Sequence, residues 1–445
     1  MICLFEQFGY KNTGYLDATY DKLCSNIPYN PITRNPKRLK ETDVSYFRIR
    51  YDKDKEKHHF ETSYFVGVDW IIENERAIYV QPKQNKEDIE IDYIGMLLEA
   101  LQEPENFNHL EELCEIDFNK PYISITQKQD LLSPFLIAQF LQLLRQIVRK
   151  GLKKSYYTVS ENLNAKVKGK VLIGKDIKEN KVKGNLIRTS CQFQEFGINC
   201  DENKILKKAY SFSRRAIQQY EKGMDTKSLQ HIIDYIHPAF ETVSEDIEIS
   251  KIKSFNPNLL FKEYDQALKL AQLILKRYSY NITLTEQEQI ATPPFWIDMS
   301  KLFELYVYKK LRAVFDSNEV QYHLKAQYQE LDFVIRSKDD KYIFVVDTKY
   351  KPRYEDHKIS IEDIRQVSGY ARIKKVYEEL RITDDYNKNI KCLIIYSHQN
   401  GVTSFDEASF TSNDNDIGKK VMKEEKGYVN FFKLGIELPV IFKRN

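Results

Sequence analysis

The sequence has 445 residues and a formal net charge of +3, from 68 Lys and Arg against 65 Asp and Glu. At roughly 150 residues per domain, this length indicates two to four domains. Hydrophobic residues make up 42% and aromatic residues 13%, which excludes wholesale disorder. The near-zero net charge excludes a protein that binds nucleic acid through uniform basicity, so any such binding must come from local patches.

The sequence carries no sign of export or of a membrane span. Its six cysteines are scattered, with no CxxC pair and no zinc-type spacing. The first residues lack the basic start and apolar core of a signal peptide. The most apolar window, Leu131 to Val148, contains Pro134, three glutamines and Arg145 and is too polar to cross a bilayer. We expect a soluble cytoplasmic protein without membrane contact.

Charge is segregated along the chain. Residues 87–117 contain eleven acidic residues and no Lys or Arg, whereas residues 151–190 contain ten basic and three acidic residues. Overall neutrality therefore averages an acidic segment with a basic one. Both segments can also be read as ordinary solvated faces.

Residues 1–125 read as a β-rich N-terminal domain. Tyr64–Asp69 and Ala77–Gln81 are rich in β-branched and aromatic residues, which predicts two strands with a turn between them. A helix is expected over Asp92–Leu101. Residues 1–60 form an extension that matches no pattern.

Residues 126–290 read as a helical middle section that includes a basic arm, residues 151–190. Ser133 is placed to cap a helix and Pro134 suits its first position, and further helices are expected over 203–222, 228–235 and 261–278. Lys166-Val167-Lys168 and Lys181-Val182-Lys183 alternate in the manner of strands. They predict a strand pair or an extended arm.

Residues 291–445 read as a mixed α/β domain, opened by Thr292-Pro293-Pro294. The expected order is a helix over 300–315, strands over 328–336 and 342–347, a long helix over 359–380 that Ser360 opens, and a strand over 391–397. The fold class is therefore a multidomain α+β or α/β protein.

A candidate site lies on the two paired strands of this last domain. Asp347 and Lys349 are two residues apart and share a face, because side chains alternate along a strand. Asp332 lies on the preceding strand, within reach across a short hairpin. Two carboxylates that converge in a partly dry site need a compensating cation, and hard oxygen ligands suit Mg²⁺. The alternative is a structural Asp–Lys ion pair.

Three further side chains are candidates for the same site. Glu304 lies in the amphipathic helix before the hairpin and can add a carboxylate; the alternative is an exposed helix residue. Gln366 and Tyr370 are four apart on the following helix and therefore share a face. They can hold the metal-site strand or touch a phosphate; the alternative is ordinary helix packing.

These residues carry a family resemblance. Asp332 followed by Asp347-x-Lys349 resembles the PD-(D/E)XK nuclease motif, with Leu331 in place of its Pro, and Gln366-x-x-x-Tyr370 resembles the motif of the RecB-like branch. More narrowly, six segments over roughly residues 60–400 resemble the McrC family: WIDMSKLFELYVYKKL, VVDTKYK, DIRQVSGYA, VGVDWIIENERAIYVQPK, KGLKKSYYTVSENLNAKVKGKVLIGKDI and FGINCDENKILKKA.

The resemblance implies a function and a partner. McrC proteins are the nuclease subunits of prokaryotic McrBC-type restriction systems, and they pair with McrB, an AAA+ GTPase that binds modified DNA. It implies a restriction-endonuclease-like C-terminal domain in which Asp332 and Asp347 ligate Mg²⁺ and Lys349 positions a water or stabilises the phosphate. The amino-terminal half would dock on the motor, and the McrC subunit would stimulate the motor's GTP hydrolysis. Two alternatives remain: a non-catalytic adaptor that activates the motor, and a nuclease of another DNA- or RNA-processing pathway on the same fold.

The basic arm has two functional interpretations. Gly169 to Asp176 comes close to a phosphate-binding G-x-x-x-x-G-K-[ST] loop, but Asp176 replaces the hydroxyl and would repel phosphate, so we expect this chain to bind no nucleotide. The lysines can instead follow the backbone of double-stranded DNA or meet an acidic surface on the motor. The tentative DNA-binding residues are Lys166, Lys168, Lys170, Lys181 and Lys183.

Overall fold

The computed structural model describes residues 1–9, 14–17, 20–24, 26–37, 44–82, 89–126, 132–220, 227–247, 262–283, 289–350, 359–383, 390–410 and 422–442. These form two compact units. Unit 1 combines residues 1–135, 224–228 and 288–445, and unit 2 consists of residues 136–223 and 229–287. The two ends of the chain thus belong to one unit, which linear division of the sequence does not anticipate.

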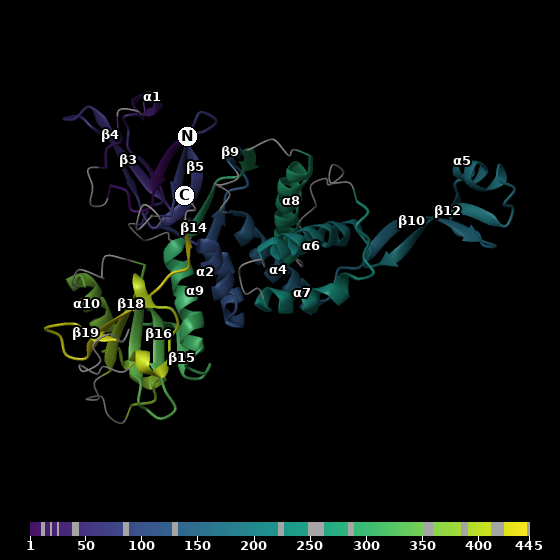
Figure 1. Cartoon of the computed structure of the whole chain (residues 1–445). Helices are drawn as coiled ribbons and strands as arrows, with labels where there is room; N and C mark the ends of the chain where they lie inside the picture. Colours follow the sequence, from purple (N-terminus) through teal and green to yellow (C-terminus); the bar gives the residue numbers. More distant parts are fainter. Residues whose placement is uncertain are drawn as a thin grey trace. The chain divides into compact units, whose positions relative to one another are not determined.

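The N-terminal part of unit 1 is built on a five-stranded sheet of order β1-β6-β5-β14-β8 (Figure 1). Its strands are β1 (Ile2–Phe5), β5 (Phe65–Ile72), β6 (Arg76–Gln81), β8 (Cys114–Ile116) and β14 (Phe295–Asp298). The predicted hairpin over 64–81 is confirmed as β5 and β6. Gly67 is required where β5 meets β14, because a Cβ there would lie 2.1 Å from the carbonyl oxygen of Phe295.

Smaller elements surround this sheet. A three-stranded sheet comprises β2 (Ile32–Arg34), β3 (Phe47–Asp52) and β4 (Lys57–Thr62), and α1 spans Asp21–Cys24. The Trp296 ring of β14 stacks on Tyr46 at 4.6 Å between centroids, within the core between these layers. The expected helix over 92–101 is confirmed as α2 (Tyr93–Ala100), which Asp92 caps. It is followed by η2 (Pro104–His109) and α3 (Leu110–Leu113).

Two strand pairs join segments that are distant in the sequence. β9 (Ile123–Thr126) pairs with β13 (Gln289–Thr292), and β7 (Ile89–Ile91) pairs with β21 (Val440–Phe442). Both pairings are antiparallel. The acidic segment 87–117 supplies β7, α2, η2, α3 and β8, with Glu87 and Asp88 outside the described residues.

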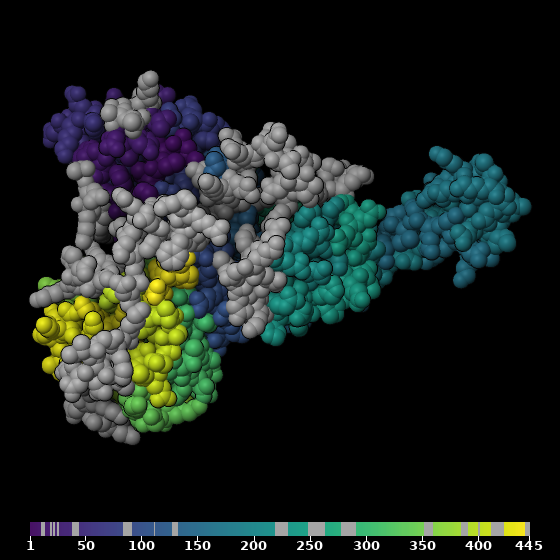
Figure 2. Space-filling model, viewed as in Figure 1, coloured from purple at the N-terminus to yellow at the C-terminus, as the bar shows by residue number. Residues whose placement is uncertain are grey.

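Unit 2 is helical and carries the arm. Its helices are α4 (Leu132–Lys150, which begins in unit 1), α6 (Asp201–Tyr220), α7 (Lys227–Phe240) and α8 (Lys262–Thr283), as predicted. β10 (Ser155–Asn164) and β12 (Arg188–Gly197) pair along ten residues to form a long antiparallel ribbon. Figure 2 shows this ribbon and its tip as a narrow projection from the helices of the unit.

The tip of the arm differs from the expectation. Lys166–Lys168 lies in a loop and Lys181–Lys183 lies in a helical turn, so the strand pair predicted there is wrong, although the extended arm is confirmed. The tip contains β11 (Lys170–Val171), α5 (Ile173–Asp176) and η4 (Ile177–Lys181). The ribbon ends where Asn164 pairs with Arg188, so both lysine motifs lie beyond its last pair of residues.

The C-terminal part of unit 1 is a six-stranded mixed sheet of order β15-β16-β17-β18-β20-β19. The strands are β15 (Val320–Ala326), β16 (Gln329–Arg336), β17 (Ile343–Lys349), β18 (Lys391–Val402), β19 (Lys423–Glu424) and β20 (Phe431–Ile436). β15, β16 and β17 are antiparallel neighbours, whereas β17, β18 and β20 run parallel. The expected helix over 300–315 is α9 (Met299–Arg312), which Asp298 caps.

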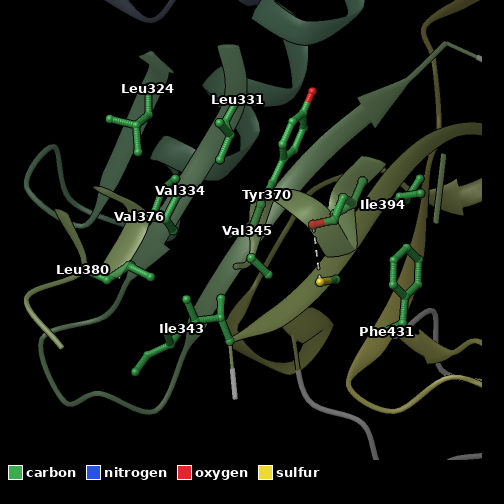
Figure 3. Packing of buried hydrophobic residues seen from close by; sticks show 14 of the residues in the cluster. Leu324, Leu331, Val334, Ile343, Val345, Tyr370, Val376, Leu380, Ile394 and Phe431 are labelled. Carbon is green, nitrogen blue, oxygen red and sulfur yellow. Dashed lines mark hydrogen bonds between the residues drawn. The ribbon is translucent and has the colours of Figure 1, made fainter. Parts of the chain in front are cut away.

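One continuous helix over 359–380 was expected, and this prediction is wrong. The segment forms two helices, α10 (Ile361–Tyr370) and α11 (Lys374–Glu379), although Ser360 caps the first as predicted. The break lets both helices bury apolar residues against one face of the sheet. Figure 3 shows Tyr370 of α10 and Val376 of α11 with Val345 of β17 and Ile394 of β18 in this core. Buried packing of this kind supplies most of the stability of such short helices.

Within the part of the chain that the structure describes, none of the helices is long and apolar enough to span a bilayer.

Candidate functional site

The hairpin of β16 and β17 brings Asp332 and Asp347 together. The antiparallel register ends by pairing Phe333 with Val346, the neighbours of the two aspartates, and the charge of Asp347 acts on Asp332. Asp347 is almost fully buried at the end of an otherwise apolar strand, with 3% of its surface exposed. The juxtaposition expected from the sequence is therefore present.

Thr348 fixes the position of Asp332. Its main-chain amide and its hydroxyl both donate to Oδ2 of Asp332, at 2.7 and 2.6 Å. Sequence reasoning missed this residue, which lies between Asp347 and Lys349 on the strand. Both hydrogen bonds fall on the same oxygen of the Asp332 carboxylate.

Lys349 neutralises part of the acidic charge. Its Nζ lies 2.8 Å from Oδ2 of Asp347 and 3.6 Å from Oδ1 of Asp363. Asp363 is buried in the first turn of α10. Its main-chain amide donates to the capping hydroxyl of Ser360, and its place beside the site was not foreseen.

Gln366 and Tyr370 extend the network from α10. Lys349 Nζ donates to Oε1 of Gln366 at 3.1 Å, and Nε2 of Gln366 donates to the hydroxyl of Tyr370 at 2.6 Å. The shared helix face is thus confirmed, and Gln366 lies in direct contact with the lysine.

Glu304 reaches the same region from α9. It is buried, with 9% of its surface exposed, which excludes the alternative of a solvent-exposed helix residue. Nε2 of His323 lies 2.5 Å from Oε1 of Glu304, and Nζ of Lys301 lies 3.5 Å from the same oxygen. Burial alone would raise the pKa of Glu304, but the hydrogen bond from His323 and the charge of Lys301 outweigh it and lower that pKa.

The pKa values of Asp332 and Asp347 shift upward, in the opposite direction to that of Glu304. Burial, then the charges of Glu304 and Asp347, raise the pKa of Asp332 well above its usual range. Burial also raises the pKa of Asp347, and the charge and hydrogen bond of Lys349 only partly offset this. The negative charges of Glu304, Asp332 and Asp347 thus act on one another in a buried place, and the nearby cations Lys301 and Lys349 compensate only part of them.

Tyr350 ties this site to the start of the chain. The hydroxyl of Tyr350, the residue after Lys349, donates to Oε1 of Glu6 at 3.1 Å, and both residues are buried. No local sequence signal marks a contact between residues 344 positions apart. It links the strand end that carries the site to the N-terminal sheet.

The five candidate lysines of the arm lie in unit 2 and are all exposed. Lys168 forms an ion pair with Glu195 at 2.9 Å and lies over the ring of Phe193. The same tip exposes six large aliphatic residues: Val167, Ile173, Ile177, Val182, Leu186 and Ile187. Asp176 accepts hydrogen bonds from the side chain of Asn180 and the main chain of Ser190, which is a structural use and not that of a phosphate-binding loop.

The family described as "McrBC 5-methylcytosine restriction system component" matches residues 62–380. The chain belongs to this family. The resemblance to McrC is thereby confirmed at the level of the McrBC components. All candidate residues of the site and of the arm fall inside the matched range.

Two solved structures are similar to this McrBC component. The refined half-complex from a tetradecameric assembly of Thermococcus gammatolerans McrB AAA+ hexamers with bound McrC contains a chain with 14% identity and a TM-score of 0.36, over 99% of this chain and 96% of that chain. The cryo-EM structure of the Thermococcus gammatolerans McrBC complex matches with 14% identity and a TM-score of 0.26, over 70% of this chain and 86% of that chain. No curated protein gives a significant match.

Proposed function

We propose that this chain is the nuclease subunit of an McrBC-type restriction system. It is a Mg²⁺-dependent endodeoxyribonuclease with a C-terminal domain of the PD-(D/E)XK type. It cleaves modified double-stranded DNA together with an McrB-like AAA+ GTPase, whose GTP hydrolysis it stimulates. The observation that carries this proposal is the meeting of Glu304, Asp332, Asp347 and Lys349 around the ends of two paired strands.

The donor set suits a hard cation. Three carboxylates, two of them with raised pKa values, present oxygen ligands and an excess of negative charge. Magnesium prefers carboxylate oxygens and retains several waters, which leaves positions for a phosphate and a nucleophile. When bound, Mg²⁺ would polarise the phosphate and lower the pKa of a coordinated water.

Lys349 acts as a donor in this proposal. Burial opposes protonation, but the charge and hydrogen bond of Asp347 raise the pKa of Lys349 and keep it an ammonium. An ammonium cannot accept the proton of the attacking water. It can hold that water or stabilise the additional negative charge of the phosphate in the transition state. Gln366 orients the ammonium, and Tyr370 orients Gln366.

The family membership favours a role beside a motor. Its description names a restriction-system component, and the sequence lacks a competent nucleotide-binding loop. We therefore assign GTP hydrolysis to the partner and no nucleotide to this chain. The non-catalytic adaptor is disfavoured because an adaptor needs none of the four clustered residues.

The arm has two candidate partners, and its surface favours the protein. Val182 and Leu186 are 78% and 72% exposed among the lysines of the tip. An aliphatic surface gains from burial against another protein, whereas phosphate contacts need only the charges. We assign the tip to the motor contact, together with the N-terminal half. The alternative use is contact with the DNA backbone through Lys166, Lys168, Lys170, Lys181 and Lys183.

The test uses the full chain purified with its motor. Cleavage of methylated and unmethylated DNA is measured with GTP and Mg²⁺ for the wild type, Asp347→Ala and Glu362→Ala. Glu362 is an exposed carboxylate in the first turn of α10 and serves as the matched control. We expect cleavage of methylated DNA by the wild type and Glu362→Ala, and none by Asp347→Ala with GTP hydrolysis retained. Full cleavage by Asp347→Ala overturns the catalytic assignment. Cleavage without the motor favours a nuclease of another pathway.

A further inference from the structure

A second group of metal-ligating side chains lies beside the carboxylate site. His109 ends η2, Glu112 lies in α3 and His323 lies in β15. One ligand atom from each of the three can be chosen so that all lie within 4.8 Å of one another. This group contains two imidazoles, whereas the carboxylate site offers only oxygens.

The two histidines are held in place before any ligand arrives. The ring of Tyr322 contacts both, with centroids 4.7 Å from His109 and 3.9 Å from His323. Nδ1 of His323 lies 3.0 Å from Oε1 of Glu330. A carboxylate on Nδ1 favours the tautomer in which Nε2 can ligate a metal, and a metal on Nε2 would replace its contacts with Glu304 and Lys301.

The site already attracts positive charge. Nζ of Lys301 lies 3.3 Å from Oε2 of Glu112 and 2.5 Å from Nε2 of His323. Lys301 thus faces two carboxylates, Glu112 and Glu304. Two carboxylates, Glu304 and Glu330, contact His323. The lysine is a flexible side chain on the first turn of α9, so it can withdraw and leave its place to a smaller cation.

Solvent reaches this group from two sides. Glu112, Lys301, His323 and Glu330 line a cavity of about 340 Å³. His109 and Tyr322 line another of about 1120 Å³. A hydrated ion therefore has an entry path.

We propose that His109, Glu112 and His323 form a second metal site, which takes a borderline divalent ion such as Zn²⁺ in place of the Lys301 ammonium. Two imidazoles and a carboxylate select Zn²⁺ over Mg²⁺, and a water completes the tetrahedron. The site is separate from the proposed Mg²⁺ centre but touches it, because His323 also contacts Glu304.

The experiment measures Zn²⁺ binding by titration calorimetry on the full chain, with excess Mg²⁺ present to occupy the oxygen site. The variants are His109→Ala, His323→Ala and Lys301→Met, with His231→Ala, an exposed histidine of α7, as the control. We expect one Zn²⁺ per chain in the wild type and in His231→Ala, and binding weakened by roughly 100-fold or more when either ligand histidine is lost. Lys301→Met should bind more tightly, because the competing ammonium is gone.

Two results overturn the proposal. One is Zn²⁺ binding that is unchanged in both ligand variants; the other is failure of both the wild type and Lys301→Met to bind Zn²⁺. Circular dichroism of each variant shows whether it is folded, and visible absorption of bound Co²⁺ reports nitrogen ligation directly. Asp347→Asn should keep its Zn²⁺, so this outcome does not depend on the nuclease activity proposed above.

Discussion

Thr348 holds Asp332 with two hydrogen bonds to a single carboxylate oxygen, one from its hydroxyl and one from its main-chain amide. The proposed metal site needs a carboxylate in a fixed position, and this pair of donors fixes one oxygen of Asp332. The residue between Asp347 and Lys349 therefore has its own contact with the site.

Thr348→Val should impair cleavage without unfolding the protein. The substitution keeps the β-branched shape and the amide donor but removes the hydroxyl, a loss of about 1 kcal/mol. We expect cleavage to fall about tenfold and the Mg²⁺ requirement to rise, since Asp332 becomes less well positioned. Cleavage rates across a Mg²⁺ series measure both effects, and Thr348→Ser, which retains the hydroxyl, should stay close to the wild type.

Removing a charge from the carboxylate site should stabilise the metal-free protein. Besides burial, repulsion from Glu304 and Asp347 raises the pKa of Asp332. Asp332→Asn removes this repulsion. In EDTA we expect the variant to melt at a higher temperature than the wild type. Its free energy of unfolding should be larger by about 1–2 kcal/mol. With Mg²⁺ the order should reverse, because only the wild type gains from binding. A variant that is less stable than the wild type in EDTA contradicts this account.

Gln366 and Tyr370 should act as one unit. If Tyr370 works only by orienting Gln366 toward Lys349, Tyr370→Phe and Gln366→Ala will each slow cleavage, and the double variant will be no slower than Gln366→Ala alone. Contacting residues in one network are non-additive in this way. Single-turnover cleavage with the motor present measures the coupling. Strictly additive losses would show that Tyr370 has a separate role.

Asp298 should make stability fall as pH rises. It caps α9 by accepting a hydrogen bond from the amide of Lys301, and burial, against that bond, raises its pKa from 3.8 to about 6. The contribution of Asp298 to the free energy of unfolding is fully present below pH 3.8. It is lost as pH rises through about 6, because the ionised carboxylate is disfavoured in the folded state. Asparagine caps helices equally well and carries no charge.

Asp298→Asn should therefore be more stable than the wild type at pH 8 by about 1–3 kcal/mol, at most the value of a shift of this size. The difference should shrink below pH 5. Urea unfolding at several pH values measures it. A constant difference across this range would rule out ionisation of Asp298 as the cause.

Substitutions at the tip of the arm should distinguish a motor contact from a DNA contact. Val182→Asp and Leu186→Asp place charges on exposed aliphatic positions, and we expect loss of co-purification with the motor at unchanged thermal stability. Lys181→Ala with Lys183→Ala should weaken DNA binding in a salt-dependent manner only if the tip follows the phosphate backbone. Retention of the motor by both aspartate variants would assign the arm to DNA.

Local patterns predicted much of this structure. Alternation and capping signals located β5, β6, α2, α9, β16 and β17, and the Asp332–Asp347 pairing followed from a short hairpin. The break between α10 and α11 carries no Pro, and Gly369 lies within α10, so periodicity alone ran through it. β15 was missed because its sequence, VQYHLKA, mixes polar residues with apolar ones in a strand that packs at an edge.

The unpredicted part of the site depends on distant segments. His109 meets His323, and Glu6 meets Tyr350, only after the chain has folded. Neither pair has a spacing that a local pattern can detect. The residues that sequence reasoning found lie on one hairpin and the next helix, whereas those it missed arrive from other elements.

The pairing of β7 with β21 and the place of β14 in the N-terminal sheet affect how the chain can be divided. The strand before the six-stranded region, β14, belongs to the N-terminal sheet. The strand after it, β21, pairs with β7. A fragment of residues 291–445 would expose two unpaired strand edges and would tend to aggregate. The six-stranded region is tethered at its entrance and at its exit. Its two anchors are different, because β14 belongs to the five-stranded sheet whereas β21 pairs with β7 in a sheet of two strands.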